Sequence, residues 1–159
     1  MSHRVGFGYD VHRFERNRPF TLGGIIIPHN KGLAGHSDAD VLIHAICDAL
    51  LGAASLGDIG SHFPDSSVEY KNIDSKLLLK EVVKIVSKKN FRIGNIDTTI
   101  SLQKPKIATY IPQMIQTLAT VMEIDEADIS VKATTTERMG FVGREEGVAA
   151  YAVVLIERS

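Results

Sequence analysis

The sequence of 159 residues contains no tryptophan and a single cysteine, Cys47. One thiol has no partner within the chain for a disulfide, which is typical of a protein from a reducing compartment. With 6 Phe and 4 Tyr, the chain has few aromatic side chains on which bases stack. No apolar run approaches the roughly 18 residues of a membrane-spanning helix, and residues 1–5 lack the apolar core of a signal peptide.

The sequence also lacks an excess of charge of either sign. The 18 Lys and Arg residues nearly balance the 19 Asp and Glu residues, for a net charge of -1. Such a chain has no basic surface for nucleic acid or an anionic membrane, so we expect neither partner. Hydrophobic residues make up 44% and charged residues 23%, which indicates one globular domain over residues 1–159. We expect a cytoplasmic location, or a plastid-type compartment if a transit peptide has been removed.

Helical and strand patterns alternate along the chain, which predicts a sheet with helices packed over it. The segment 20–28 has two glycines at its middle and predicts a hairpin, so the sheet is expected to be mixed rather than parallel. The expected fold class is α+β, an α/β-type sandwich with helices on one face of a mixed sheet. The predicted helices span residues 37–54, 74–89 and 110–122, and the predicted strands span residues 4–11, 20–28, 96–102, 129–133 and 148–156, the last apolar enough to be central.

The first predicted helix, capped by Ser37 or Asp38, carries one narrow polar stripe. At 100° per residue, Ser37, Asp40, His44 and Asp48 fall within an arc of about 80°, and apolar residues cover most of the remaining surface. The stripe is either the solvent face of the helix or a functional site. A solvent face normally carries Lys, Glu or Gln, and this one carries none, which favours a site.

A metal site is the most specific interpretation of the polar residues. Asp10 and His12 end the first predicted strand, and residues two apart in a strand point to the same face. Together with His44 they offer one carboxylate and two imidazoles. That set suits zinc with a fourth position left open, as in catalytic rather than structural sites.

Two further segments are rich in groups that bind anions. Residues 34–38 lie at the start of the predicted helix, where free N–H groups attract phosphate. Residues 132–144 contain three consecutive threonines, which are either strand formers or phosphate donors, and Glu137, which is free to hold a metal. The sequence has no P-loop, no Rossmann glycine spacing and no G-x-S-x-G elbow. Any phosphate chemistry must therefore rest on metals and local loops.

Six segments, taken together and in this order, resemble the family of 2-C-methyl-D-erythritol 2,4-cyclodiphosphate synthases, which act in the non-mevalonate isoprenoid pathway. The resemblance covers essentially the whole chain. The segments are Gly8–His12, Ala34–Asp40, Asp48–Ala53, Leu56–Gly60, Phe63–Asp65 and Val131–Glu137.

The resemblance implies roles for the matching residues. Asp10, His12 and His44 would bind zinc, and Glu137 would bind a second metal, magnesium or manganese. The implied catalytic residues are Asp10, His12, His36, Thr135 and Glu137. The implied substrate-binding residues are His36, Ser37, Asp58, Ile59, Gly60, Phe63, Asp65, Lys106, Ala133, Thr134, Thr135, Phe141 and Arg144. Ile107 and Ala108 depart from the Met-Leu pair of that family's cytosine pocket.

The implied reaction is an intramolecular phosphoryl transfer. The 2-phosphate of 4-diphosphocytidyl-2-C-methyl-D-erythritol 2-phosphate attacks the β-phosphorus and expels CMP, which forms a cyclic diphosphate. The family is homotrimeric, with sheets toward the centre and active sites between subunits. It also suggests an apolar central cavity for an isoprenyl diphosphate near Phe141 and Arg144, two residues that equally have plain structural interpretations.

Two other classes of protein are consistent with the same residues. A zinc hydrolase that activates water on a phosphoester or amide would use Asp10, His12 and His44 equally well. A trimeric binding module with a structural zinc would unfold on the loss of His44 rather than only lose turnover. The products of the reaction distinguish a cyclising enzyme from a hydrolase.

Overall fold

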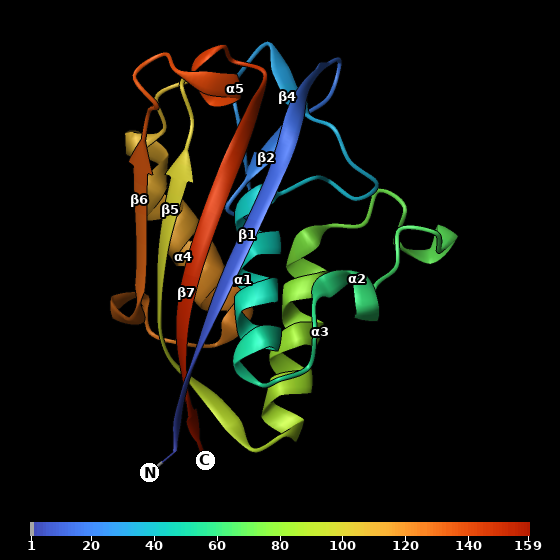
Figure 1. Cartoon of the computed structure of the whole chain (residues 1–159), viewed down its shortest axis with the longest axis vertical. Coiled ribbons are helices and arrows are strands. Elements are labelled where there is room, and N and C mark those ends of the chain that lie inside the picture. The colour runs from blue at the N-terminus through green and yellow to red at the C-terminus, as the bar shows by residue number, and fades with distance from the viewer. Residues whose placement is uncertain (1) are drawn as a thin grey trace.

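The computed structural model describes residues 2–159 (Figure 1). None of the helices in this range has both the length and the apolar character that crossing a bilayer demands. The strands are β1 (His3–Arg16), β2 (Phe20–Leu22), β3 (Ile25–Ile27), β4 (Lys31–Leu33), β5 (Phe91–Ser101), β6 (Ile129–Thr134) and β7 (Gly147–Arg158). The helices are α1 (Val41–Ala53), α2 (Ile59–His62), α3 (Ser75–Lys88), α4 (Ile111–Met122) and α5 (Gly140–Gly143).

Five strands form one mixed sheet in the order β4-β1-β7-β5-β6. β5 and β6 are parallel, and the other neighbouring pairs are antiparallel. β2 and β3 form a separate hairpin. The predictions of a mixed sheet, of a hairpin within residues 20–28 and of a central last strand are therefore confirmed.

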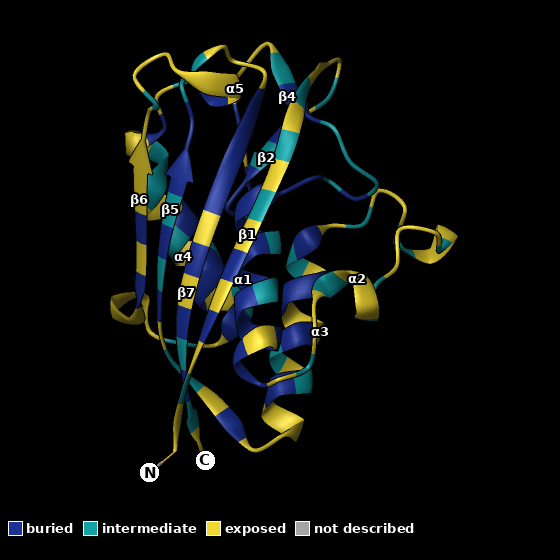
Figure 2. Cartoon of the chain, in the orientation of Figure 1, coloured by how far each residue is buried: buried dark blue, intermediate teal, exposed yellow. Residues whose placement is uncertain are grey.

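The three long helices α1, α3 and α4 lie on one face of the sheet (Figure 1). α1 lies across β1 and β7, α3 packs on α1, and α4 lies against β6 (Figure 1). The main apolar core fills the space between these layers. Along β1 and β7, buried and exposed residues alternate, so the opposite face of the sheet is open (Figure 2).

The first helix begins later than the sequence predicts, and neither Ser37 nor Asp38 caps it. Ala39 has a φ of 59°, which is incompatible with a continuous right-handed helix. Asp40 is the N-cap instead, and its Oδ1 accepts a hydrogen bond from Ile43 N at 3.0 Å. Ser37 therefore precedes α1 and is not part of its polar stripe. The change of chain direction at Ala39 still places Ser37 beside His44.

Asp40 is not part of the polar stripe either, because its side chain is buried against the β2–β3 turn. Its carboxylate is fully buried and accepts hydrogen bonds from Gly23 N and Gly24 N in the β2–β3 turn. Burial raises the pKa of Asp40, and the hydrogen bonds from Ile43, Gly24 and Gly23 oppose that rise. Asp40 therefore joins the hairpin to the start of α1.

Several elements are longer or more numerous than predicted. β1 continues past Val11 because its pairing with β7 extends to Arg13 and β4 then pairs with residues 14–16. β5 begins at Phe91 rather than residue 96 because Phe91 pairs with Arg158. β4, α2 and α5 were not predicted, since three or four residues are too few to show a periodicity.

β1 lies unusually close to α1 at two glycines. A Cβ atom on Gly8 would lie 1.8 Å from the carbonyl oxygen of Ala45, and one on Gly6 would lie 1.9 Å from that of Ala49. No side chain fits at either position. Because alternate residues of a strand share a face, Asp10 and His12 continue the line of these glycines and also face α1.

We expect Gly8→Ala to lower the free energy of unfolding by about 3 kcal/mol or more, since the new methyl group would overlap backbone that cannot yield. Gly52→Ala is the matched control, because Gly52 lies in α1 with no atom within 4 Å of its added Cβ. That change should stabilise the protein by about 0.5–1 kcal/mol. Urea unfolding at one protein concentration measures both variants, and equal stabilities would contradict the close approach.

Candidate functional site

Three potential metal ligands converge where β1 passes the first turn of α1. His12 Nε2 lies 2.9 Å and His44 Nδ1 lies 3.1 Å from the same oxygen, Asp10 Oδ2. The two ring nitrogens are 3.3 Å apart. Among residues 2–159 this is the one group of at least three His, Cys, Asp or Glu side chains close enough to hold a common ion.

The hydrogen bonds of the outer ring nitrogens fix which nitrogens face the site. His12 Nδ1 lies 2.8 Å from the carbonyl oxygen of Ala34, which can only accept, so Nδ1 carries the proton. His44 Nε2 lies 2.9 Å from Ser75 Oγ and 3.2 Å from Ser37 Oγ. In the neutral rings, the lone pairs of His12 Nε2 and His44 Nδ1 therefore point toward Asp10.

The spacing of these atoms fits a tetrahedral ion. Ligands with bonds of about 2.0–2.1 Å to a tetrahedral zinc lie about 3.3–3.4 Å apart. The three separations of 2.9, 3.1 and 3.3 Å are close to that edge length. Two imidazoles and one carboxylate suit zinc and similar divalent metals, and three protein ligands leave a fourth position for substrate.

The charges at the site are mutually stabilising. Burial acts to raise the pKa of Asp10, but the hydrogen bonds and positive charge of His12 and His44 outweigh it and lower that pKa to about 2. Burial likewise acts to lower the pKa of His12, and the hydrogen bond and charge of Asp10 raise it above the ordinary value of 6.5. Asp10 and His12 therefore each favour the charged form of the other.

A pocket of about 220 Å³ opens beside the three ligands. It brings together six of the substrate-binding residues that the resemblance implies: His36, Ser37, Ile59, Gly60, Phe63 and Asp65. Tyr70, Ile73 and Leu78, which the sequence did not single out, complete the wall. They come from the segment before α3 and from α3 itself.

The turn into α2 positions one wall of this pocket. Asp48, from α1, accepts a hydrogen bond from Ile59 N at 2.7 Å. Burial raises the pKa of Asp48, and that hydrogen bond opposes the rise. Asp58 does not line the pocket: it is the N-cap of α2 and accepts from Ser61 N at 2.9 Å.

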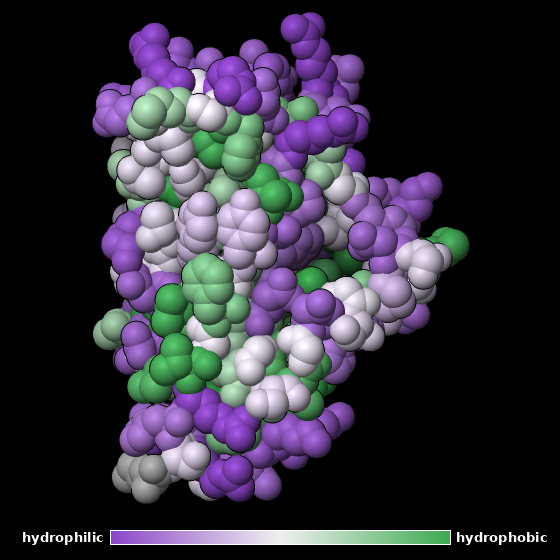
Figure 3. Space-filling model, in the orientation of Figure 1, coloured by the Kyte–Doolittle hydropathy of each residue, from purple (hydrophilic) through white to green (hydrophobic). Residues whose placement is uncertain are grey.

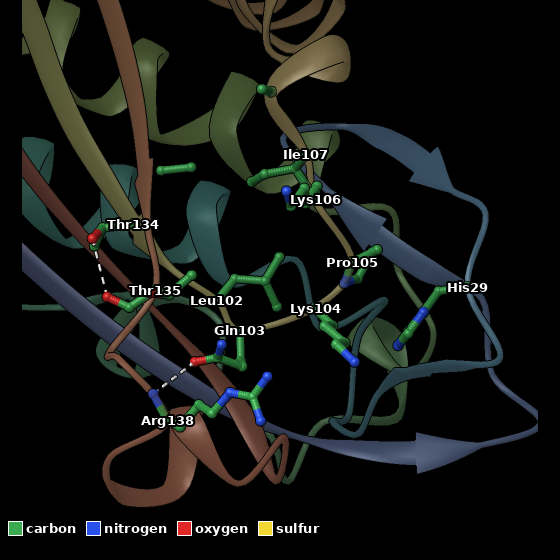
Figure 4. A pocket seen from close by; sticks show the side chains of 12 residues that line it. His29, Leu102, Gln103, Lys104, Pro105, Lys106, Ile107, Thr134, Thr135 and Arg138 are labelled. Carbon is green, nitrogen blue, oxygen red and sulfur yellow. Dashed lines mark hydrogen bonds between the residues drawn. The ribbon is translucent and has the colours of Figure 1, made fainter.

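A second, larger pocket of about 700 Å³ lies at the ends of β5 and β6 (Figure 4). It contains the predicted residues Lys106, Ala133, Thr134 and Thr135. The loop after β5 supplies most of the other lining residues, including Ile107 and Ala108. None of its lining residues belongs to the pocket beside Asp10.

Four polar residues of the large pocket were missed by the sequence reasoning: His29, Gln103, Lys104 and Arg138. Gln103 Oε1 accepts a hydrogen bond from Arg138 N at 3.2 Å, which joins the two loops that form the pocket (Figure 4). Lys104 stands next to the predicted segment around Lys106, and Arg138 directly follows Glu137. Each of these cations adjoins a residue that the resemblance nominates, Lys106 or Glu137, and that proximity was the available signal.

Besides Asp58, three nominated residues lie outside both pockets of the single chain. Glu137 is exposed, and its backbone N–H donates to Thr135 Oγ1 at 3.2 Å. Phe141 is partly exposed in α5. Arg144 pairs with Glu146 at 2.9 Å and lines a separate cavity of about 280 Å³ with His29 and Lys31.

Comparisons with known proteins agree over the full length of the chain. The model of the YgbB family matches residues 3–157. A Bacteroides fragilis protein named 2-C-methyl-D-erythritol 2,4-cyclodiphosphate synthase is 62% identical over 158 residues, which cover 99% of each chain.

Two solved structures are similar as well. The bifunctional IspDF from Campylobacter jejuni is 43% identical with a TM-score of 0.96; the match covers 99% of this chain and 43% of that longer one. The IspF–CDP complex from Plasmodium falciparum is 35% identical with a TM-score of 0.87, and the match covers 99% and 97% of the two chains.

We expect the affinity of the site for Zn²⁺ to rise from about pH 6 to about pH 8, because the metal must displace the proton that His12 retains above its ordinary pKa. Titration calorimetry in two buffers of different ionisation enthalpy should show that binding releases protons below the raised His12 pKa. Binding that neither releases protons nor depends on pH would contradict the assignment of these ligands.

Proposed function

The chain belongs to the YgbB family, so it is an enzyme of the cyclodiphosphate synthase class in isoprenoid biosynthesis, and we propose that it acts on 4-diphosphocytidyl-2-C-methyl-D-erythritol 2-phosphate. The products are 2-C-methyl-D-erythritol 2,4-cyclodiphosphate and CMP. The observation that carries this proposal is the convergence of Asp10, His12 and His44 beside a polar pocket. The CDP complex of the Plasmodium relative supports a cytidine nucleotide as part of the ligand.

The proposed step is an in-line displacement at phosphorus. An oxygen of the 2-phosphate forms a bond to the β-phosphorus, and the bond from that phosphorus to the oxygen bridging the α- and β-phosphates breaks. CMP leaves with the electron pair of that bond. The reaction needs no covalent enzyme intermediate and no added oxidant or reductant, so positioning and charge neutralisation carry most of the catalysis.

Asp10, His12 and His44 would hold zinc, which supplies positive charge to orient and polarise the phosphate groups. His36 and Ser37 adjoin these ligands and would bind phosphate oxygens. His36 is held in place by Ser67, whose carbonyl oxygen lies 3.0 Å from Nε2. The apolar side chains on the other side of the pocket would exclude water from the reacting phosphates.

Asp65, Ile59 and Gly60 would face the methylerythritol carbons and hydroxyl groups, with Asp58 fixing the turn that carries them. Phe63 would pack against the apolar edge of the same group.

The large pocket is proposed to bind the cytidine diphosphate end. Ala133, Thr134, Thr135 and Lys106 line it and offer a hydroxyl-rich wall with a cation. Lys104 and Arg138 add two further positive charges near the diphosphate. Glu137 would hold magnesium or manganese, which stabilises the CMP leaving group.

A homotrimer is proposed because the pocket beside the metal ligands and the proposed nucleotide pocket share no lining residue within a single chain. The open face of the sheet carries exposed Val5, Phe7, Tyr9, Tyr151 and Val153. Figure 3 shows apolar and weakly polar side chains over the middle of this face and charged ones at its two ends. A patch of this kind on a sheet favours burial against another subunit.

Packing these faces around a threefold axis would place the metal pocket of one subunit beside the nucleotide pocket of its neighbour. The same arrangement would enclose an apolar centre, with Phe141 and Arg144 at one end, that suits an isoprenyl diphosphate.

We expect phosphorus NMR of the metal-loaded protein with the proposed substrate to show CMP and a cyclic diphosphate. His44→Ala should lower turnover at least about 100-fold, because one of three metal ligands is lost. His3→Ala is the control, since His3 lies at the exposed start of β1 and should leave the rate unchanged. Release of an open-chain phosphate by the wild type would instead identify the alternative function, a zinc-dependent phosphoester hydrolase.

We expect Phe7→Glu to convert the trimer to smaller species in sedimentation experiments, because it places a charge in the proposed interface. Phe7 is 63% exposed in the single chain. Ile26→Glu is the matched control: Ile26 is 70% exposed but lies on the separate β2–β3 hairpin. A stable wild-type monomer would remove the trimer from this account.

A further inference from the structure

We propose that Asp38 and Ser75 are positioning residues for the metal ligand His44. The three side chains form one hydrogen-bonded chain from a carboxylate through a hydroxyl to an imidazole. This inference rests on the proposed metal centre. Asp38 and Ser75 would not contact the metal or the substrate and would act only by orienting His44. Ser75 lies 31 positions from His44 and is the first residue of α3.

Ser75 is fully buried, and the direction of its hydrogen bonds is fixed. Its hydroxyl donates to Asp38 Oδ1, and its backbone N–H donates to Asp38 Oδ2 at 3.0 Å. Because the Ser75 hydroxyl uses its one O–H group in the hydrogen bond to Asp38, Ser75 Oγ can only accept a hydrogen bond from His44 Nε2, which lies 2.9 Å away. The proton of His44 is therefore kept on Nε2, and the lone pair on Nδ1 remains directed toward Asp10.

Asp38 is itself held from two sides. Its backbone N–H donates to the carbonyl oxygen of Ile73 at 3.1 Å, and its Oδ1 accepts from Asp40 N at 3.2 Å. The carboxylate thus has a fixed orientation at the outer end of the chain. A carboxylate that interacts with the outer nitrogen of a ligand histidine makes the ring a better donor to the metal.

Ser37 is a weaker partner for the same nitrogen. Its Oγ lies 3.2 Å from His44 Nε2, accepts from Ala39 N at 3.2 Å, and makes no hydrogen bond to a carboxylate. Ser37 is also proposed to bind a substrate phosphate. When its hydroxyl turns to that phosphate, the Asp38–Ser75 pair still fixes the ring of His44.

The test is the dissociation constant of Zn²⁺ from the full-length protein, measured by competition with a chelator. Ser75→Ala should weaken zinc binding about 10–100-fold, the usual cost of losing an outer partner of a ligand histidine. Asp38→Asn should weaken it in the same direction, because the carboxylate charge is lost while the side-chain shape is kept. Ser75→Thr retains the hydroxyl and should restore most of the affinity.

Asp74→Ala is the matched control for the stability of α3. Asp74 is the N-cap of that helix and accepts from Lys76 N at 2.9 Å. This variant should lower the unfolding midpoint of the metal-free protein and leave zinc affinity unchanged. If Asp74→Ala weakened zinc binding as much as Ser75→Ala, the effect would belong to helix stability and the positioning role would be wrong.

The remaining outcomes separate this inference from the proposed function. A wild-type protein that does not bind zinc would overturn the metal centre and the inference with it. A wild type that binds zinc, together with a Ser75→Ala variant of equal affinity, would overturn only the inference. If Ser75→Ala does not fold, an unchanged zinc affinity of folded Asp38→Asn overturns it in the same way.

Discussion

The close contact between β1 and α1 is the constraint on which the rest of the structure depends. Gly6 and Gly8 remove the side chains that would otherwise hold the helix away from the strand. The strand then presents Asp10 and His12 to the first turn of α1, close enough for both to reach His44. Because alternate residues of a strand share a face, the glycines and the ligands belong to one row. The close packing of β1 on α1 therefore also sets the distances between the three potential metal ligands.

The fold separates two kinds of surface that the proposed reaction needs. The helix-covered side of the sheet buries the core and supports the ligand cluster, while the ends of β5 and β6 carry the larger pocket. The open face of the sheet is the side that no helix covers, and it carries exposed apolar side chains (Figure 2). In the proposed trimer, covering this face stabilises the assembly and also completes the active site, so folding, association and catalysis depend on the same strands.

The sequence predicts the elements with strong periodicity and the ligands that lie on them. Asp10 and His12 follow from strand alternation, and His44 follows from a polar position on an otherwise apolar helix. The start of that helix is not predictable in this way, because an alanine gives no sign in the sequence of the left-handed conformation that Ala39 adopts. Ser75 was missed for a related reason. Its contact with His44 joins residues far apart in sequence, and a serine at a helix start ordinarily indicates only capping. His29, Lys104 and Arg138 likewise meet at one pocket only after folding.

We propose that Asp10, His12 and His44 form one metal centre, and the function described above depends on it. Anomalous diffraction at the zinc absorption edge, from crystals of the zinc-loaded protein, tests it most directly. We expect one strong peak within about 2.0–2.2 Å of Asp10 Oδ2, His12 Nε2 and His44 Nδ1. Strong zinc peaks elsewhere in the same crystals, with none between these three atoms, would contradict it.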